Sequence, residues 1–209
     1  ALNPSNHAQN NDNELVVVDG KRIAYKSFNI ENRKKGEPIL VFETGLGGGT
    51  FGPILPFLPS NISGIQYARN GVGKSELDTE ITSDSQLADR LHNLLTTLNI
   101  EPPYLLVGHS IGGPYIRLFA SKFPNEVCGL VFSDPTDFML TVEEDEEARI
   151  KSKSATGYRE TSLLIQKMMS ENDSFGQGAR NDATRALKSS VSGYFQEYQH
   201  LPELNRNIA

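Results

Sequence analysis

Residues 104–113, Tyr-Leu-Leu-Val-Gly-His-Ser-Ile-Gly-Gly, decide the fold of this chain. An apolar run ends at Val107 and an amphipathic run extends from Ile111 to Phe123, so the pattern predicts a strand, a tight turn and a helix. Ser110 stands at the apex of the turn, and glycines two residues before and after it let neighbouring backbone pass closely. A serine in this context is a candidate nucleophile, because amide donors and the dipole at a helix start favour a developing negative charge.

The composition and charge exclude several classes of protein. The 209 residues suffice for one domain with a full core and an insertion. The net charge of −6 argues against nucleic acid and anionic membrane surfaces as partners, and no apolar run is long enough for a membrane span. The single cysteine, Cys128, excludes an internal disulfide and is predicted to be a small buried hydrophobe in a strand. The compartment stays open between the cytoplasm and secretion after signal removal.

The first part of the chain predicts three strands after a polar tail. Residues 1–13 are rich in asparagine and form the tail. Leu15–Val18 and Arg22–Tyr25 flank Asp19-Gly20, which is a two-residue hairpin signal. Pro38–Phe42 is an almost continuous apolar run, typical of a strand buried on both faces of a parallel sheet.

A glycine-rich segment, Glu43–Thr50, follows this buried strand directly. So many glycines at the end of a strand indicate backbone that must approach another group closely. A merely flexible loop is the alternative. We favour a functional loop, because it follows a buried strand and the Ser110 turn comes later in the chain.

The next strand, Ile65–Tyr67, runs into a segment with two interpretations. Ala68 together with Gly73-Lys74-Ser75 fits a relaxed phosphate-binding loop, and Asp134 after a strand could then bind a metal ion. Such a loop must open a helix at its lysine. Here the acidic stretch Glu76–Glu80 follows, without apolar periodicity, so nucleotide binding is not favoured.

Helices alternate with strands through the middle of the chain. Ser83–Asn99 has a capping box at its start and an apolar stripe of leucines, with His92 beside that stripe at a surface or boundary position. Val127–Phe132 is predicted to be another buried strand. This order predicts an α/β fold with a mostly parallel sheet covered by helices on both faces. Ser110 would lie at the carboxyl ends of the strands, where such sheets bind ligands.

The character of the sequence changes near Phe138. Thr141 and Glu144 have capping-box spacing, and the acidic run Glu143–Glu147 suits a solvated helix start. Further helices are predicted around residues 163–169 and over residues 183–199. Met168 and Met169 either line an adaptable pocket or pack in the core.

Four segments in this order resemble the α/β-hydrolase superfamily, and specifically its lid-bearing serine esterase-like members. Residues 42–47 resemble the oxyanion loop, and residues 67–75 resemble the Asp-Arg-x-Gly-x-Gly-x-Ser turn, with Ala68 in place of the Asp. Residues 106–113 resemble the nucleophile elbow, and residues 130–135 close the following strand.

The resemblance implies a hydrolase core over residues 14–140 and a helical lid over residues 141–209. Ser110 would be the nucleophile, and the backbone N–H groups of Leu46 and Ile111 would form the oxyanion hole. The implied chemistry is hydrolysis of small carboxylic esters through an acyl-enzyme, with no metal or cofactor. Prolyl-type aminopeptidases, amidases and carbon–carbon bond hydrolases share this constellation, and a non-catalytic protein that binds a small ligand is a further alternative.

The family's base and acid have no clear counterpart. The histidines are His7, His92, His109 and His200. Of these, only His200 follows Ser110 in the sequence. Asp134 is a candidate acid, but we favour a structural turn before Pro135 for this residue. The segment up to Ala209 resembles the lead-in to the family's next strand. The resemblance therefore implies that this is the N-terminal portion of a hydrolase, with base and acid supplied by sequence beyond Ala209 or by a second chain.

Overall fold

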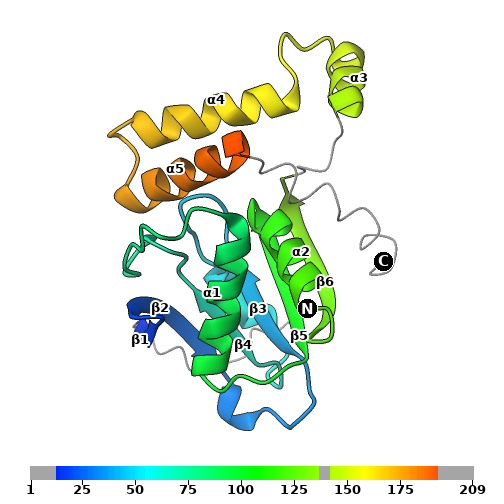
Figure 1. Cartoon of the computed structure of the whole chain (residues 1–209). Helices are drawn as coiled ribbons and strands as arrows, with labels where there is room; N and C mark the ends of the chain where they lie inside the picture. Colours follow the sequence, from blue (N-terminus) through cyan, green and yellow to red (C-terminus); the bar gives the residue numbers. More distant parts are fainter. Residues whose placement is uncertain (1–12, 137–141, 193–209) are drawn as a thin grey trace.

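The computed structural model describes residues 13–136 and 142–192. The strands are β1 (Glu14–Val18), β2 (Lys21–Phe28), β3 (Ile39–Glu43), β4 (Gly64–Tyr67), β5 (Tyr104–Ser110) and β6 (Val127–Pro135). The helices are α1 (Asp84–Thr97), α2 (Gly112–Lys122), α3 (Val142–Ser152), α4 (Tyr158–Glu171) and α5 (Gln177–Ser192), with 3-10 helices η1 (Ile30–Asn32) and η2 (Gly52–Phe57). Figure 1 shows α4 and α5 stacked at one end of the sheet.

One sheet runs through the described residues in the order β1-β2-β4-β3-β5-β6. Strands β4, β3, β5 and β6 are parallel, while β1 and β2 form an antiparallel hairpin at the edge. Asp19 and Gly20 have φ angles of 50° and 77°, as a tight hairpin turn requires. The prediction of an α/β fold with a mostly parallel sheet is confirmed.

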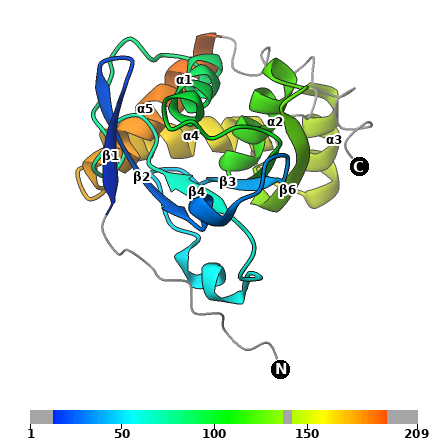
Figure 2. The same cartoon turned by 90° about the horizontal axis from the view of Figure 1, so that it is seen from below.

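The main core lies between one face of the sheet and the helices α1 and α2. Leu94 and Leu95 of α1 and Phe119 of α2 are fully buried against this face. Ser83 caps α1 through the expected capping box with Gln86. On the opposite face, in the described part of the chain, η2 covers a smaller apolar cluster (Figure 2).

Strand β6 departs from the predicted burial. It pairs with β5 and forms an edge of the described sheet. Val131 and Phe132 are both 44% exposed, and Cys128 is exposed as well, so the prediction that this strand and its cysteine are buried is wrong. An apolar run alone cannot distinguish a central strand from an edge strand, because both kinds of strand can have the same pattern of apolar residues.

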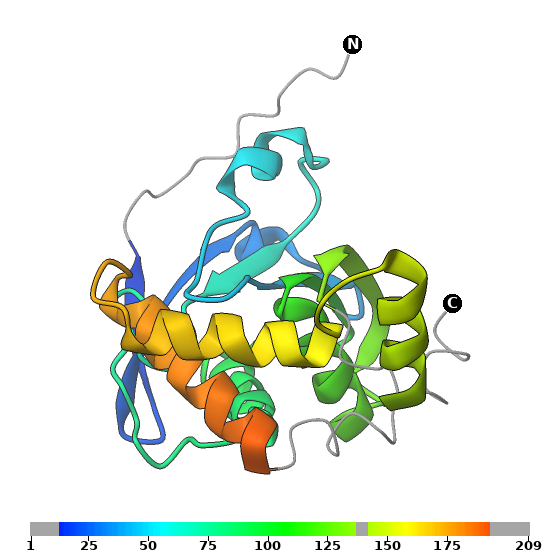
Figure 3. The same ribbon diagram turned by 90° about the horizontal axis from the view of Figure 1, so that it is seen from above.

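The C-terminal helices form a separate layer, seen from above in Figure 3. Helix α3 begins with acidic residues as predicted, whereas Thr141, its expected cap, lies outside the described residues. Met168 on α4 is 51% exposed and therefore belongs to no core. Helix α5 begins at Gln177, earlier than predicted. Its Gly178 packs against the backbone of Val72, so a poor helix former is retained there. None of the described helices is both long and apolar enough to cross a membrane.

Candidate active site

Ser110 lies where β5 ends, two residues before α2 begins. Its φ angle is +53°, a left-handed conformation that side-chain-bearing residues adopt at a cost. The serine is half-buried. The predicted turn between strand and helix is therefore present, and it is strained at the serine itself.

The glycines around the turn are explained by close backbone approaches. A Cβ at Gly108 would lie 2.5 Å from the carbonyl oxygen of Gly112, and one at Gly112 would lie 2.3 Å from the carbonyl oxygen of Glu43. A Cβ at Gly113 would lie 2.6 Å from the side chain of Pro135. Any larger residue would clash with backbone or with a rigid ring. The absence of a side chain at these glycines therefore allows β3, β5 and α2 to approach one another closely at the turn.

The strain at Ser110 can be measured directly. We expect Ser110→Gly to be more stable than Ser110→Ala by about 1 kcal/mol, because glycine adopts a positive φ without the Cβ clash. Thermal unfolding of the two variants measures the difference, at roughly 2–4 °C per kcal/mol for a chain of this size. At Ser121, an exposed residue of helix α2, the order should reverse, with alanine the more stable. Equal stability of the two Ser110 variants would contradict a strained turn.

The neighbours of Ser110 come from two other segments. Its Oγ lies 3.3 Å from Oγ1 of Thr136, and the Thr136 N–H donates to the Ser110 carbonyl oxygen at 2.9 Å. A Cβ at Gly45 would lie 3.5 Å from Cβ of Ser110 and 3.0 Å from Nδ1 of His109. The residues that follow β3 and those that follow β6 therefore meet at the serine.

Neither described histidine serves as a partner of Ser110. His92 stacks on Phe123 with ring centroids 4.1 Å apart and hydrogen-bonds Glu126 at 3.1 Å, so its predicted boundary role is confirmed. His109 is exposed, its ring lies beside Gly45, and the hydrogen bond that Ser110 Oγ makes in the described part of the chain is to Thr136. His7 and His200 lie outside the described residues. Asp134 is exposed with φ +45° at the end of β6, which fits a structural turn.

The two expected oxyanion donors are placed by different segments. Ile111 immediately precedes α2, and Leu46 lies in the glycine loop, which we define as Thr44–Thr50. Within the described residues, the backbone N–H of neither one makes an intramolecular hydrogen bond. Leu46 and Ile111 belong to the same apolar cluster. Neither N–H group therefore has an acceptor in residues 13–136 and 142–192.

The glycine loop packs on the side chain of Arg69, which is only 1% exposed. Its guanidinium donates to the carbonyl oxygens of Thr44 at 2.6 Å and Gly45 at 2.5 Å. It also forms ion pairs with Glu43 on β3 and Asp182 on α5. One buried side chain therefore ties the end of β3, the glycine loop and a C-terminal helix together.

Asp182 completes this arrangement from helix α5. One carboxylate oxygen pairs with Arg69 and accepts the N–H of Gly47 at 2.8 Å, and the other accepts from Arg185 at 2.9 Å. Arg185 also pairs with Asp84 at the start of α1 and donates to the hydroxyl of Tyr115. We call Glu43, Arg69, Asp84, Asp182 and Arg185 the buried ionic network.

The network keeps its key charges in spite of burial. Burial by itself would raise the pKa of Asp182, but Arg69 and Arg185 outweigh it and lower that pKa to about 2. Burial opposes the charge of Arg69, yet Asp182 and Glu43 raise its pKa well above the ordinary range. Burial also dominates at Glu43, whose pKa is raised although Arg69 and the Tyr67 hydroxyl favour the anion. Asp182 and Arg69 are therefore charged at neutral pH.

Sequence reasoning missed this network. Arg69 belongs to the segment that resembles the family turn, so the motif itself was the available signal. Asp182 and Arg185 gave none, because charged residues in a helix are normally solvated. Their burial follows from tertiary pairing across 113 residues of chain between Arg69 and Asp182.

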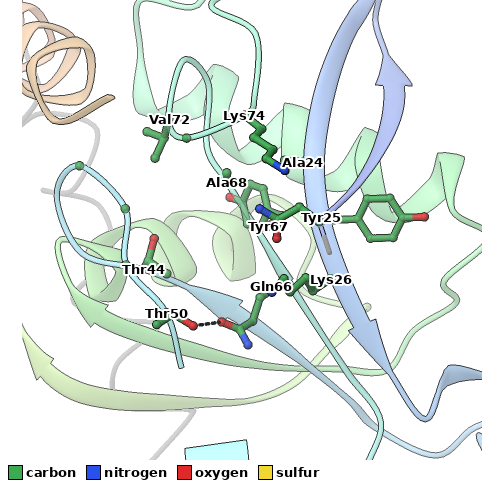
Figure 4. Close-up of a pocket in the computed structure, with 15 residues that line it drawn as sticks. Ala24, Tyr25, Lys26, Thr44, Thr50, Gln66, Tyr67, Ala68, Val72 and Lys74 are labelled. Carbon is green, nitrogen blue, oxygen red and sulfur yellow. Dashed lines mark hydrogen bonds between the residues drawn. The ribbon is translucent and has the colours of Figure 1, made fainter. Parts of the chain in front are cut away.

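The phosphate-binding interpretation is contradicted by the local fold. Residues 71–75 form turns, and the segment up to Glu80 contains no helix that could present amide donors to a phosphate. Instead, Gly73 and Lys74 border a cavity of about 440 Å³ together with Thr44, Thr50 and Gln66. Figure 4 shows this cavity, with Thr50 and Gln66 joined by a hydrogen bond. Ser110 is not among its lining residues.

Comparison with known proteins places the chain in a family. A sequence profile described as alpha/beta hydrolase fold matches residues 38–206. The chain therefore belongs to the α/β-hydrolase fold family. It shares 17% identity with a crystal structure of DBJA, with a TM-score of 0.63 over 95% of this chain and 77% of that one. A putative lipase from Acinetobacter baumannii AYE gives a TM-score of 0.54 at 19% identity, over 94% and 66% of the two chains.

Three curated relatives align with part of the chain. The uncharacterized protein YqjL of Bacillus subtilis is 33% identical over 113 residues, 52% of this chain and 44% of YqjL. Methylesterase 2 of Arabidopsis thaliana is 31% identical over 80 residues, 38% of this chain and 30% of that protein. Monoacylglycerol lipase ABHD6 of Bos taurus is 28% identical over 116 residues, 54% and 34% of the two. The chain thus spans less than half the length of each of these relatives.

Proposed function

We propose that this chain carries the nucleophile and the oxyanion hole of a serine hydrolase that cleaves small carboxylic esters. The observation that carries the proposal is the meeting of Ser110, at a strained turn before α2, with Gly45-Leu46 of the glycine loop. The N–H groups of Leu46 and Ile111, which have no acceptor in the described part of the chain, support it, because two donors beside a nucleophile suit a tetrahedral intermediate.

The reaction would proceed in two steps. Ser110 Oγ attacks the ester carbonyl carbon while a base takes the hydroxyl proton, and the oxyanion is stabilised by Leu46 and Ile111. Collapse breaks the carbon–oxygen bond, and the proton passes to the departing alcohol. Water then attacks the acyl-enzyme, which releases the carboxylic acid and restores the serine. No step needs a metal or an organic cofactor.

We propose that the base and acid come from sequence beyond Ala209 or from a second chain. The hydrogen-bond partner of Ser110 in the described part is the hydroxyl of Thr136, which is no base at neutral pH. Of the two described histidines, His92 hydrogen-bonds Glu126 and the ring of His109 lies beside Gly45. We further propose that α3, α4 and α5 serve as the lid that selects the substrate.

The ester as substrate is supported by the relatives. Methylesterases from Arabidopsis thaliana and the lipase ABHD6 align with this chain. Amides and carbon–carbon bonds would use the same nucleophile and oxyanion hole, and the choice would depend on the lid and the base.

A fluorophosphonate probe tests the proposal. We expect the polypeptide as its source expresses it to be labelled, with the adduct mapped by mass spectrometry to the peptide that contains Ser110. Residues 1–209 alone should react more slowly by several orders of magnitude, because an unassisted serine hydroxyl is a weak nucleophile. An adduct on another serine would contradict Ser110 as the nucleophile, and no adduct at all would favour the non-catalytic alternative. Equal rates for the two polypeptides would refute an external base.

A further inference from the structure

We propose that Arg69 and Asp182 are positioning residues that aim the Leu46 N–H at the oxyanion, and that helix α5 holds them there. This inference rests on the proposed function and adds to it a role for the C-terminal helices. The observation is a chain of buried contacts, from Asp182 on α5 through Arg69 to the carbonyl oxygen of Gly45.

The peptide between Gly45 and Leu46 links Arg69 to the expected oxyanion donor. Its carbonyl oxygen and its N–H point in opposite directions, because the peptide is planar and trans. Arg69 and the N–H of Gly48, at 3.1 Å, both donate to the Gly45 oxygen. Fixing the oxygen on the Arg69 side therefore turns the Leu46 N–H to the opposite side of the peptide plane. A charge-assisted bond at the oxygen also polarises the peptide and strengthens its N–H as a donor.

The position of the Arg69 side chain depends on a contact with helix α5. The side chain of Asp182 is 0% exposed, and it binds both the guanidinium of Arg69 and the Gly47 N–H. A Cβ at Gly47 would lie 2.6 Å from Cβ of Ala179, so α5 touches the loop backbone directly. Separation of α5 from the loop would leave Arg69 without one of its carboxylates and Gly47 without its acceptor.

A positioning role of Arg69 and Asp182 differs measurably from a general effect on stability. A structural defect lowers every reaction of Ser110 in proportion to the folded fraction. A misplaced oxyanion donor slows only reactions in which an oxygen anion is bound. Diethyl p-nitrophenyl phosphate places a P=O oxygen in the hole, and its phosphorothionate places a larger, weakly accepting sulfur there. The ratio of the two labelling rates therefore reports on the donor.

The test compares Asp182→Asn with wild type and with Asp173→Asn, in the polypeptide as its source expresses it. Asp173 precedes α5, its side chain is 94% exposed, and it pairs with Arg180, so it is a matched control. We expect Asp182→Asn to lower the oxygen-to-sulfur rate ratio by about tenfold or more, while Asp173→Asn leaves it unchanged. Arg69→Lys, which keeps the charge but loses the planar fork, should lower the ratio similarly.

Amide hydrogen exchange at Leu46 and Gly47 supplies a second readout that needs no reaction. We expect exchange at Gly47 to be accelerated at least tenfold in Asp182→Asn and unchanged in Asp173→Asn. If the wild type does not react with the phosphate, the proposed function fails. The exchange rate at Gly47 still tests whether Asp182 binds the glycine loop. An unchanged rate ratio in a folded, reactive Asp182→Asn variant, or unchanged exchange at Gly47, overturns the inference.

Discussion

The Ser110→Ala variant is expected to lose ester hydrolysis almost completely, with kcat reduced by about 10⁶-fold when the base and acid are present. The reason is that alanine offers no oxygen for the acyl-enzyme, and the residual rate then comes from the oxyanion hole and substrate binding alone. Hydrolysis of p-nitrophenyl acetate by the polypeptide as its source expresses it measures the effect.

Ser133→Ala is the matched control for this loss. Ser133 is exposed on β6 and lies opposite His109 in the sheet register, one residue from the turn. Its replacement should leave kcat within about twofold, since surface substitutions of this kind usually change little. The assignment of Ser110 would be wrong if its alanine variant kept a tenth or more of the wild-type kcat. Thermal unfolding of both variants shows whether a loss is chemical or structural.

The second large effect is expected on stability, at Arg69. The Arg69→Met variant should be destabilised by about 3–5 kcal/mol, because it leaves the buried carboxyl groups of Glu43 and Asp182 without their shared cation. This is a large part of the total for a typical domain, about 5–15 kcal/mol. Urea unfolding at neutral pH, with the midpoint and slope fitted together, measures the change.

Arg22→Met provides the comparison. Arg22 also pairs with a glutamate, Glu76, but their side chains are 59% and 37% exposed. An exposed pair of this kind contributes about 0–1 kcal/mol, so the two arginine variants should differ severalfold. Arg69→Lys offers a milder replacement if the methionine variant does not fold. A loss at Arg69 as small as the one expected at Arg22 would show that the buried ionic network adds little to stability.

The parts of the fold that sequence could predict are those set by local periodicity and turn chemistry. The hairpin at Asp19-Gly20, the capped helix α1 and the turn at Ser110 follow from residues close together in sequence. The apolar run of β6 does not predict its edge position, since such a run does not state how many neighbours a strand has; only the resemblance, which puts the next strand beyond Ala209, implies it. The early start of α5 at Gln177 depends on contacts with Val72 and Gly47, far away in sequence.

The candidate site likewise has one part that is predictable from local sequence and one part that depends on long-range contacts. Ser110 is predictable from its own turn, whereas Leu46 is implied only by the resemblance of residues 42–47 to the oxyanion loop. The charges beneath them are not, because Asp182 becomes a partner of Arg69 only after the chain has folded back over 113 residues. The role of Leu46 and Ile111 as donors stays a prediction.

The length of that separation has a consequence for how the chain folds during synthesis. Arg69 follows Glu43 by 26 residues, but Asp182 follows Arg69 by 113 residues and emerges from the ribosome much later. Until then the sheet lacks the carboxylate that binds Arg69 and the N–H of Gly47. We therefore expect the glycine loop to be among the last parts to become ordered, because long-range contacts form late. A nascent chain arrested before residue 182 would hold Ser110 at its turn without a completed loop beside it.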